Sequence, residues 1–482
     1  MLKRRFTLTS KMILSSVLLA ACGGGGSGGG NGQVPTATLT APANFADNLT
    51  GTITLNATAT DDVAVANVEF QVDGKTLLTT SNGPLYQAPL NTSSYASGQH
   101  VVRARSRDGA GNVSAWASAT VRFGGAVEVP AGFTKNEAWI SGLTSATAMA
   151  QAPDGRLFVA EQGGALRIVK NNALLTTPFL QLGVDSTGER GLIGVTLHPD
   201  FANNGYVYVH YTTAEGGTHN RVQRFQAIPP SSDVVSAGSG LALVDLPPLS
   251  ATNHNGGAIH FSADGKLLVG VGDNAVGANS QNLNNPLGKL LRFNDDLSIP
   301  GDNPFAGSST GQGRAIWAYG LRNPFTFAVQ PGSGRIHIND VGQNTWEEIN
   351  LGAAGANYGW SASEGPDNIG PGVTRPIFNY KHSAAIPAGS GEGGFFTGFS
   401  IAGGAFYPSS GANAVFPAEF RSNYFFADFI SRFVGVLDLA NGNGNAAYSF
   451  ASLAGSPVDM LVGQDGALYV LTRTAITRIS AP

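Results

Sequence analysis

Two ionisable side chains stand at the ends of neighbouring apolar stretches near the middle of the chain. His254 lies in an Asn-His-Asn-Gly-Gly run just before one stretch, and Asp273 ends the next. The Asp-Gly pair at residues 264–265 predicts a tight turn between them, so both stretches should be adjacent strands. An imidazole with an unperturbed pKa of about 6.5 can accept a proton near neutral pH. We therefore interpret His254 as a candidate general base.

The remaining histidines that we considered have surroundings that favour packing. His198 precedes a Pro-Asp turn, whereas His210, His260 and His337 occupy expected strand positions. A buried ring or a single hydrogen bond is enough to explain a histidine at such positions. The neighbours of His254 are loop formers instead, and glycine there allows a ligand to approach the backbone closely.

Two more loops carry side chains suited to chemistry. Arg322 and Asn323 directly follow the apolar run 316–321, which places a guanidinium at a strand end, and Glu189 lies in a Gly-Glu-Arg-Gly loop. A fixed positive charge near a reacting group can stabilise negative charge that develops there. The alternative for Arg322 is an ordinary ion pair with an acid such as Asp340.

A third region is rich in oxygen donors. Glu347 and Glu348 are followed by Tyr358 and Glu364 within less than twenty residues. Carboxylate and carbonyl oxygens are the ligands that a hard cation such as Ca²⁺ prefers. Solvated surface charges are the alternative interpretation of the two neighbouring glutamates.

The composition narrows the class of protein. Among 482 residues there are 65 glycines and 25 prolines, and only 12% of the residues are charged. Many short strands joined by tight turns have this composition, which favours an all-β fold. The net charge is −4, and no cluster of Lys or Arg occurs beyond residue 5. The sequence therefore indicates no positively charged surface that would bind nucleic acid. No Walker loop or His-Glu-x-x-His motif is present, and the glycines at 270–272 precede a helix-poor segment rather than a Rossmann helix.

One pattern recurs from residue 131 to the end of the chain. A turn followed by an apolar strand occurs six times, at residues 153–159, 199–209, 263–269, 332–338, 421–426 and 464–470. Repeats separated by about 40 to 90 residues suit one four-stranded blade each. The spacing therefore predicts a six-bladed β-propeller over 131–482, with function expected at the mouth of its central channel.

The N-terminal part has a different organisation. Residues 1–22 contain a basic start, an apolar core too short to span a bilayer and Leu-Ala-Ala-Cys, which resembles a lipoprotein signal ending at Cys22. Residues 23–34 form a Gly/Ser-rich tether. Residues 35–123 alternate apolar and polar positions in about seven short stretches, which predicts an Ig-like β-sandwich similar to bacterial surface modules. We expect a lipid-anchored protein of the bacterial cell envelope.

The propeller part resembles the glucose/sorbosone dehydrogenase family, the soluble sugar dehydrogenases that use pyrroloquinoline quinone (PQQ). The motifs that carry this resemblance are Gly-Glu-Arg-Gly-Leu-Ile-Gly at 188–194, Leu-His-Pro-Asp-Phe at 197–201, Gly-Lys-Leu-Leu-Arg at 288–292, Asp-Asn-Pro-Phe at 302–305, Gly-Leu-Arg-Asn-Pro at 320–324 and Asn-Tyr-Gly-Trp at 357–360. The resemblance implies a six-bladed propeller, in agreement with the repeats. It also implies oxidation of an aldose or oligosaccharide, with an external electron acceptor.

The same resemblance implies roles for the residues singled out above. His254 would take the proton of the anomeric hydroxyl while hydride passes from sugar C1 to the quinone. Asp273 would orient His254, and Arg322 and Asn323 would face the quinone. Glu189 matches a glutamine that lies close to the substrate.

Calcium is also implied by the resemblance. Two consecutive backbone carbonyls, at Gly342 and Gln343, would hold a cofactor calcium. A structural calcium would lie at Glu348 and the carbonyl of Tyr358, completed by Glu364 or Asp367.

One family feature is missing from the sequence. The positions where the well-studied members clamp the carboxylates of the quinone with Lys and Arg hold Ile430, Ser456 and Val458. Our leading hypothesis is a PQQ- and calcium-dependent aldose dehydrogenase. The alternatives are a non-enzymatic cell-surface propeller that binds glycan or protein, and a calcium-dependent lactonase.

Overall fold

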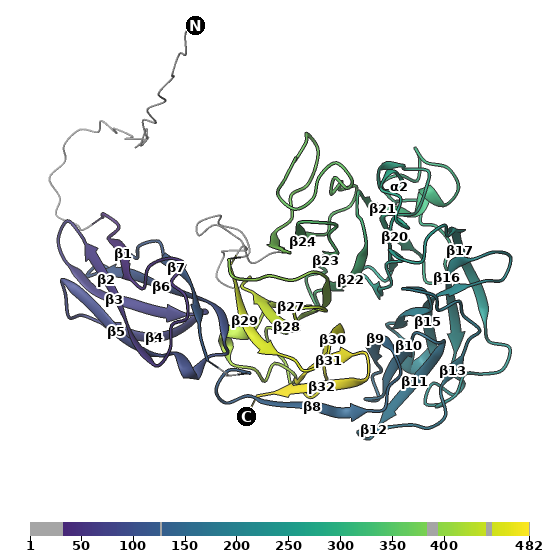
Figure 1. Ribbon diagram of the computed structural model, residues 1–482, viewed down its shortest axis with the longest axis horizontal. Helices are drawn as coiled ribbons and strands as arrows, with labels where there is room; N and C mark the ends of the chain where they lie inside the picture. Colours follow the sequence, from purple (N-terminus) through teal and green to yellow (C-terminus); the bar gives the residue numbers. More distant parts are fainter. Residues whose placement is uncertain (1–31, 126–127, 383–393, 440–445, 482) are drawn as a thin grey trace, which may run out of the picture.

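The computed structural model describes residues 32–125, 128–382, 394–439 and 446–481 of the chain. The predicted lipoprotein signal with Cys22, and nearly all of the predicted tether, lie outside these residues. In the described part, no helix has the length and apolar content needed to cross a bilayer. Figure 1 shows two bodies, a small β-sandwich and a large ring of sheets.

The small body is the predicted Ig-like sandwich, and the described residues before 125 form seven strands in two sheets. The strands are β1 (Thr36–Ala41), β2 (Thr52–Thr60), β3 (Val65–Val72), β4 (Lys75–Thr80), β5 (Leu85–Asn91), β6 (Gly98–Asp108) and β7 (Ala117–Phe123), with a 3₁₀ turn η1 (Thr92–Ser94). One sheet has the order β1-β2-β5 and the other β4-β3-β6-β7. In β5 buried and exposed residues alternate strictly, because one face of each sheet packs on the shared core.

The large body is the predicted six-bladed propeller, as counted over the described residues. Blade one contains β9 (Ala146–Gln151), β10 (Leu157–Glu161), β11 (Ala165–Lys170), β12 (Ala173–Leu174) and the short β13 (Leu180–Gln181); blade two contains β14 (Leu192–Leu197), β15 (Tyr206–Thr213), β16 (His219–Gln226) and β17 (Leu241–Pro248). Blade three contains β18 (Ile259–Phe261), β19 (Leu267–Val271), β20 (Lys289–Phe293) and β21 (Ile316–Tyr319); blade four contains β22 (Pro324–Val329), β23 (Ile336–Asp340), β24 (Trp346–Leu351) and β25 (Phe378–Lys381). Blade five contains β26 (Ile401–Phe406), β27 (Tyr424–Asp428), β28 (Phe433–Leu437) and β29 (Ala447–Ser452).

Blade six closes the ring. Its strands β30 (Pro457–Val462), β31 (Leu468–Thr472) and β32 (Ala475–Ser480) are completed by β8 (Thr134–Ser141), which comes from before blade one. Pairing the last strand with the first strand of the propeller joins the two ends of the ring through backbone hydrogen bonds. The loops also carry the short helices α1 (Phe201–Asn204) and α2 (Ala278–Gln281) and the 3₁₀ turns η2 (Gly311–Ala315) and η3 (Ala418–Phe420).

The six sequence repeats correspond to the second strands of the six blades. A residue with positive φ lies one or two positions before each strand, and five of the six are glycines, which adopt this conformation without strain. These residues are Gly155, Gly205, Gly265, Gly334, Ser422 and Gly466. The strands that follow, such as β10, β19 and β31, are buried throughout, because adjacent blades cover both of their faces.

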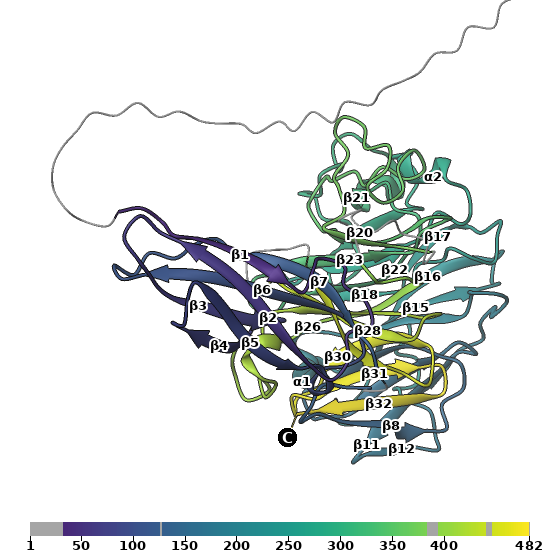
Figure 2. The same ribbon diagram turned by 60° about the vertical axis from the view of Figure 1, so that its left-hand side comes forward.

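The sandwich packs on the outside of blade five. Figure 2 shows it beside the ring, and β6 packs against β29. The side-chain amide of Gln99 donates to the carbonyl of Ala447 (2.6 Å), and the Gln99 backbone N–H donates to Ser449 Oγ (2.9 Å). A Cβ at Gly98 would overlap Ser449 Oγ, so only glycine allows this close approach.

Candidate active site

The loop that carries His254 is shaped by glycines. His254 has a φ of +55°, and the loop then leads into β18 of blade three. A Cβ at Gly256 would lie 2.4 Å from the carbonyl oxygen of Gly270, and one at Gly272 would lie 2.2 Å from the carbonyl oxygen of His254. The loop therefore lies directly on the end of β19, which brings His254 beside Asp273.

His254 and Asp273 form a buried pair. His254 Nδ1 lies 2.7 Å from Asp273 Oδ1, and the two residues are 7% and 1% exposed. The other oxygen, Oδ2, accepts from the indole N–H of Trp360 (2.7 Å), and Oδ1 also accepts from the backbone N–H of Ala275 (2.8 Å). Because these donors hold the carboxylate, it presents an acceptor to Nδ1–H and leaves Nε2 of His254 as the free proton acceptor.

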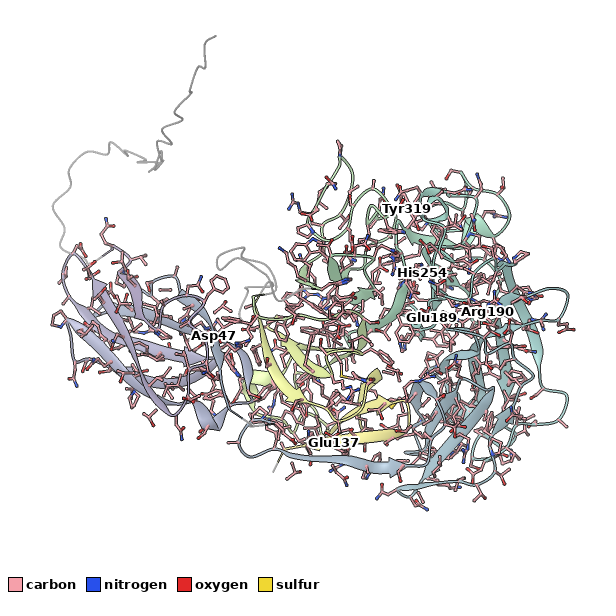
Figure 3. The ribbon with its side chains drawn as sticks, in the orientation of Figure 1. Asp47, Glu137, Glu189, Arg190, His254 and Tyr319 are labelled. Carbon is pink, nitrogen blue, oxygen red and sulfur yellow. The ribbon has the colours of Figure 1, made fainter. Side chains whose placement is uncertain are left out.

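This imidazole borders a cavity of about 570 Å³ at the mouth of the propeller. Figure 3 shows His254 and Glu189 near each other toward the middle of the ring. The cavity is lined by Thr147, Gln162, Gly188, Glu189, Ile193, Asn253, His254, Arg322, Asn323, Phe325, Val341, Gly342, Gln343, His382, Phe399, Ser400, Ala402, Phe429, Val458 and Arg473. Its volume falls within the range of small-molecule sites in proteins, roughly 300 to 1,000 Å³.

Arg322 is held at the cavity wall by neutral oxygens. Its Nε and Nη2 donate to Gln343 Oε1 (2.8 and 2.5 Å), and Nη1 donates to the carbonyl of Val341 (2.9 Å). The guanidinium also lies 5.7 Å from the ring of Trp360. The alternative ion pair with Asp340 is wrong: that carboxylate accepts the backbone N–H groups of Arg322 and Asn323. The positive charge of Arg322 thus remains available to a ligand.

Asn323 and Glu189 both support the histidine loop. Asn323 Oδ1 accepts from the backbone N–H of Gly256 (2.9 Å), and Glu189 Oε2 accepts from the backbone N–H of His254 (2.7 Å). Both side chains also line the cavity, and Glu189 is exposed there. Each residue can therefore position the base as well as contact a ligand.

The oxygen-rich region forms a small cavity behind Arg322. Asp340, Glu348, Tyr358, Ser363 and Glu364 border it. Burial raises the pKa of Glu348 to about 7, with a further contribution from the charges of Glu364 and Glu347. Burial and the nearby Glu348 carboxylate raise the pKa of Asp340. No group of three or more His, Cys, Asp or Glu side chains in the described ranges is placed to hold a metal ion. Calcium at these residues stays a prediction.

All three carboxylates among the predicted calcium ligands have protein partners, and Glu348 accepts from Asn350 Nδ2 (3.0 Å) and from the backbone N–H of Gly365. Glu364 Oε1 accepts the backbone N–H groups of Gln343, Asn344 and Thr345 at 2.8 to 2.9 Å. Asp367 Oδ2 accepts from the indole of Trp346 (2.9 Å). These bonds shape the turn that carries Gly342 and Gln343. Both of those residues line the main cavity, where their carbonyl role in binding calcium stays a prediction.

The three positions that lack the family cations lie in different surroundings. Val458 lines the cavity. Ser456, two residues earlier in the chain, is half-buried, and Ile430 is 53% exposed. The nearby Arg432 is exposed and donates to the carbonyl of Ala454, away from the described lining. A different arginine, Arg473, reaches the cavity.

Several site residues escaped the sequence reasoning. Trp360, which fixes Asp273, lies in a segment that the sequence singled out for its oxygen donors and for its Asn-Tyr-Gly-Trp motif, but the role of the indole was not predicted. His382 lines the cavity with Nε2 2.7 Å from the buried Glu347, a second histidine–carboxylate pair. Lys289 is fully buried behind Asp273, and burial lowers its pKa to about 7. Nothing in their local sequence distinguishes these residues from ordinary packing.

Comparison with known proteins decides the family. The model of the "Glucose / Sorbosone dehydrogenase" family matches residues 143–480, and that of the "Bacterial Ig domain" matches residues 35–104. The chain belongs to the glucose/sorbosone dehydrogenase family. This membership agrees with the six-bladed fold and with the resemblance seen in the sequence.

Individual members of the glucose/sorbosone dehydrogenase family support the assignment. The aldose sugar dehydrogenase YliI of Escherichia coli (strain K12) is 30% identical over 342 residues, which cover 67% of this chain and 86% of that protein. The apo-form crystal structure of the E. coli soluble aldose sugar dehydrogenase has a TM-score of 0.61 at 28% identity, covering 72% of this chain and all of that one. The PQQ-bound aldose sugar dehydrogenase of Streptomyces coelicolor has a TM-score of 0.58 at 25% identity, covering 73% of this chain and all of that one.

Proposed function

We propose that this chain is a PQQ-dependent dehydrogenase that oxidises an aldose or oligosaccharide at C1. The observation that carries the proposal is the His254–Asp273 pair, whose imidazole borders a cavity also lined by Arg322. A binding module needs no carboxylate that fixes the ring nitrogen of a cavity histidine, whereas a general base does. The relatives named above add that aldose oxidation and PQQ occur on this fold.

The residues of the cavity fit a quinone that carries carboxylates. Phe325, Phe399 and Phe429 provide apolar surface for a flat ring system, and Arg322 and Arg473 provide donors for negative groups. When bound, the quinone would supply the two-electron acceptor for the hydride of sugar C1.

His254 would then act on the sugar hydroxyl. Its Nε2 takes the proton of the anomeric hydroxyl as the C1–H bond breaks, which turns the aldose into a lactone. Asp273 stabilises the imidazolium that forms, and Trp360 and the Ala275 backbone keep that carboxylate in place. The Arg322 guanidinium favours negative charge that develops within the cavity.

Calcium and the cell envelope complete the proposal. Glu348 and the carbonyl of Tyr358 are oxygen ligands of the kind that suit Ca²⁺, and the repulsion between the buried carboxylates of Glu348 and Asp340 favours a cation nearby. A bacterial Ig domain in front of the propeller supports a location in the cell envelope. We propose anchoring through Cys22, with an external electron acceptor.

The test is reconstitution followed by dye reduction. Wild-type protein and His254→Ala are loaded with PQQ and Ca²⁺ and assayed over a panel of aldoses and oligosaccharides. We expect wild-type turnover and a loss on the order of 10²- to 10⁴-fold in His254→Ala, because general-base catalysis contributes about that much. His198→Gln, which alters a histidine outside the cavity lining, is the matched control. No wild-type turnover at saturating cofactor, or unchanged activity of His254→Ala, refutes the proposal.

A further inference from the structure

Arg473 enters the cavity from the turn that joins β31 to β32 in blade six. In this blade Pro457 of β30 pairs with Thr472 of β31. Ser456 directly precedes β30 and Arg473 directly follows β31, so each adjoins this pair at the same end of the blade. Val458 and Arg473 both line the cavity. The part of blade six that has no cation at Ser456 and Val458 thus has an arginine in the adjoining turn.

The guanidinium of Arg473 is held without a counter-ion. Nη1 donates to the carbonyl of Ala146 (3.0 Å), and Nη2 donates to Gln162 Oε1. Several arginines of low exposure have carboxylate partners, namely Arg156 with Asp154 and Asp233, Arg190 with Asp185, and Arg292 with Asp264 and Asp302, whereas Arg103 bonds to Gln71. Among the described residues, no carboxylate forms an ion pair with Arg473. Burial accordingly lowers the pKa of its guanidinium.

The cavity as a whole has an excess of positive groups. Arg322 and Arg473 both line it without an ion-paired carboxylate, and they come from opposite parts of the ring, between blades three and four and in blade six. Among the described lining residues the one carboxylate is that of Glu189, which already accepts the His254 backbone N–H. A half-buried cation that lacks a counter-ion gains most from an anionic ligand, and a guanidinium suits a carboxylate in particular.

We propose that Arg473 forms a carboxylate-binding subsite on the blade-six side of the cavity, which holds a carboxylate of the bound quinone. This inference rests on the proposed function for the identity of the ligand. The same chemistry could be supplied by an acidic sugar, so the experiment includes both sources. In either case Arg473 binds and positions the ligand, while His254 on the other side takes the proton.

The test measures binding to the metal-loaded apoprotein, independently of turnover. PQQ and D-glucuronate are each titrated by calorimetry, with D-glucose as the neutral reference. We expect Arg473→Met to weaken PQQ binding on the order of 10- to 100-fold, the loss of one charge-assisted contact. Arg473→Lys keeps the charge and should stay within several-fold of wild type. Arg432→Met, an exposed arginine outside the lining, should bind as wild type does. If Arg473→Met does not fold, Arg473→Gln replaces it.

The outcomes separate the subsite from the proposed function. If the wild type binds no PQQ, the proposed function fails. The subsite then stands only if D-glucuronate binds more tightly than D-glucose and this preference is lost in Arg473→Met. The inference is overturned if Arg473→Met and Arg473→Gln bind PQQ and D-glucuronate as tightly as wild type. It is equally overturned if the wild type binds neither carboxylate ligand.

Discussion

Replacing Asp273 by asparagine tests how the candidate base is oriented. Three N–H groups point at this carboxylate: His254 Nδ1 and the Ala275 backbone at Oδ1, and Trp360 Nε1 at Oδ2. An asparagine has almost the same shape but presents one NH₂ group in place of an oxygen. Whichever way the amide lies, at least one pair of donors must face each other. The substitution therefore disturbs the site at a position that is 1% exposed, where water cannot compensate.

The size of the effect depends on where the amide nitrogen lies. If it faces His254, the imidazole must expose a protonated Nε2 and can no longer accept the proton of the sugar. If it faces Trp360, the orientation of His254 survives but the negative charge that stabilises the imidazolium is lost. The first arrangement removes general-base catalysis and the second weakens it, so we expect kcat/KM to fall on the order of 10²- to 10⁴-fold. An unpaired buried donor should also cost about 1 to 3 kcal/mol of stability.

The assay is steady-state dye reduction at saturating PQQ and Ca²⁺, combined with a PQQ titration. Asp273 does not line the main cavity and borders only a smaller adjoining one, so PQQ affinity should change much less than kcat. Trp360→Phe is the companion variant, because it deletes a single donor to Oδ2 and should cost about ten-fold or less. Activity of Asp273→Asn within three-fold of wild type, in a preparation where His254→Ala is inactive, would refute the role that we assign to the pair.

Two further predictions concern stability. Burial lowers the pKa of His210 and His260 to about 4 and that of His337 to about 3, so below pH 6.5 only the unfolded chain gains protons at these sites. These histidines therefore lower the melting temperature as the pH drops from 6.5 toward 4, whereas buried carboxylates with a raised pKa, such as Glu348, act in the opposite direction. The melting temperature of His337→Leu relative to wild type should accordingly rise as the pH falls, and a difference that stays constant over this range would contradict the reasoning. Ca²⁺ at millimolar concentration should raise the melting temperature of chelator-treated protein by several degrees, since a ligand at about 100 times its Kd adds roughly 2.7 kcal/mol. Glu348→Gln should remove this response, and identical melting curves with and without Ca²⁺ in the wild type would exclude a structural calcium.

The sequence predicted the fold well because the signals of a propeller are local. Each blade carries a turn with a positive-φ residue, and then a strand buried on both faces, so the repeat can be counted without knowing any long-range contact. The adjacency of His254 and Asp273 was predictable for the same reason, since one hairpin separates them. The Ig-like sandwich followed from the alternation of apolar and polar residues in strands such as β2.

Contacts made across the ring could not be predicted in this way. The indole of Trp360 donates to Asp273, which lies 87 residues away in the chain. The guanidinium of Arg473 donates to Gln162, which lies 311 residues away. The sequence alone left two interpretations of Arg322. Only the fold shows that Asp340 accepts a hydrogen bond from the backbone N–H of Arg322 and not from its guanidinium. Loops from different blades meet at the channel mouth, and their lengths and turns decide which side chains reach it.

The positions that lack the family cations show how contacts between residues distant in the chain change a functional conclusion. Position by position, Ile430, Ser456 and Val458 indicate a cavity that has lost its means of holding carboxylates. A ligand, however, responds to where a charge lies in space and not to the strand that carries it. Arg473 follows β31 at the end where Pro457 pairs with Thr472 and lines the cavity, so an arginine in this turn can supply the charge that Ser456 and Val458 lack. Absence of a family cation from its usual position therefore argues against cofactor binding only where no nearby residue brings a cation to the same cavity.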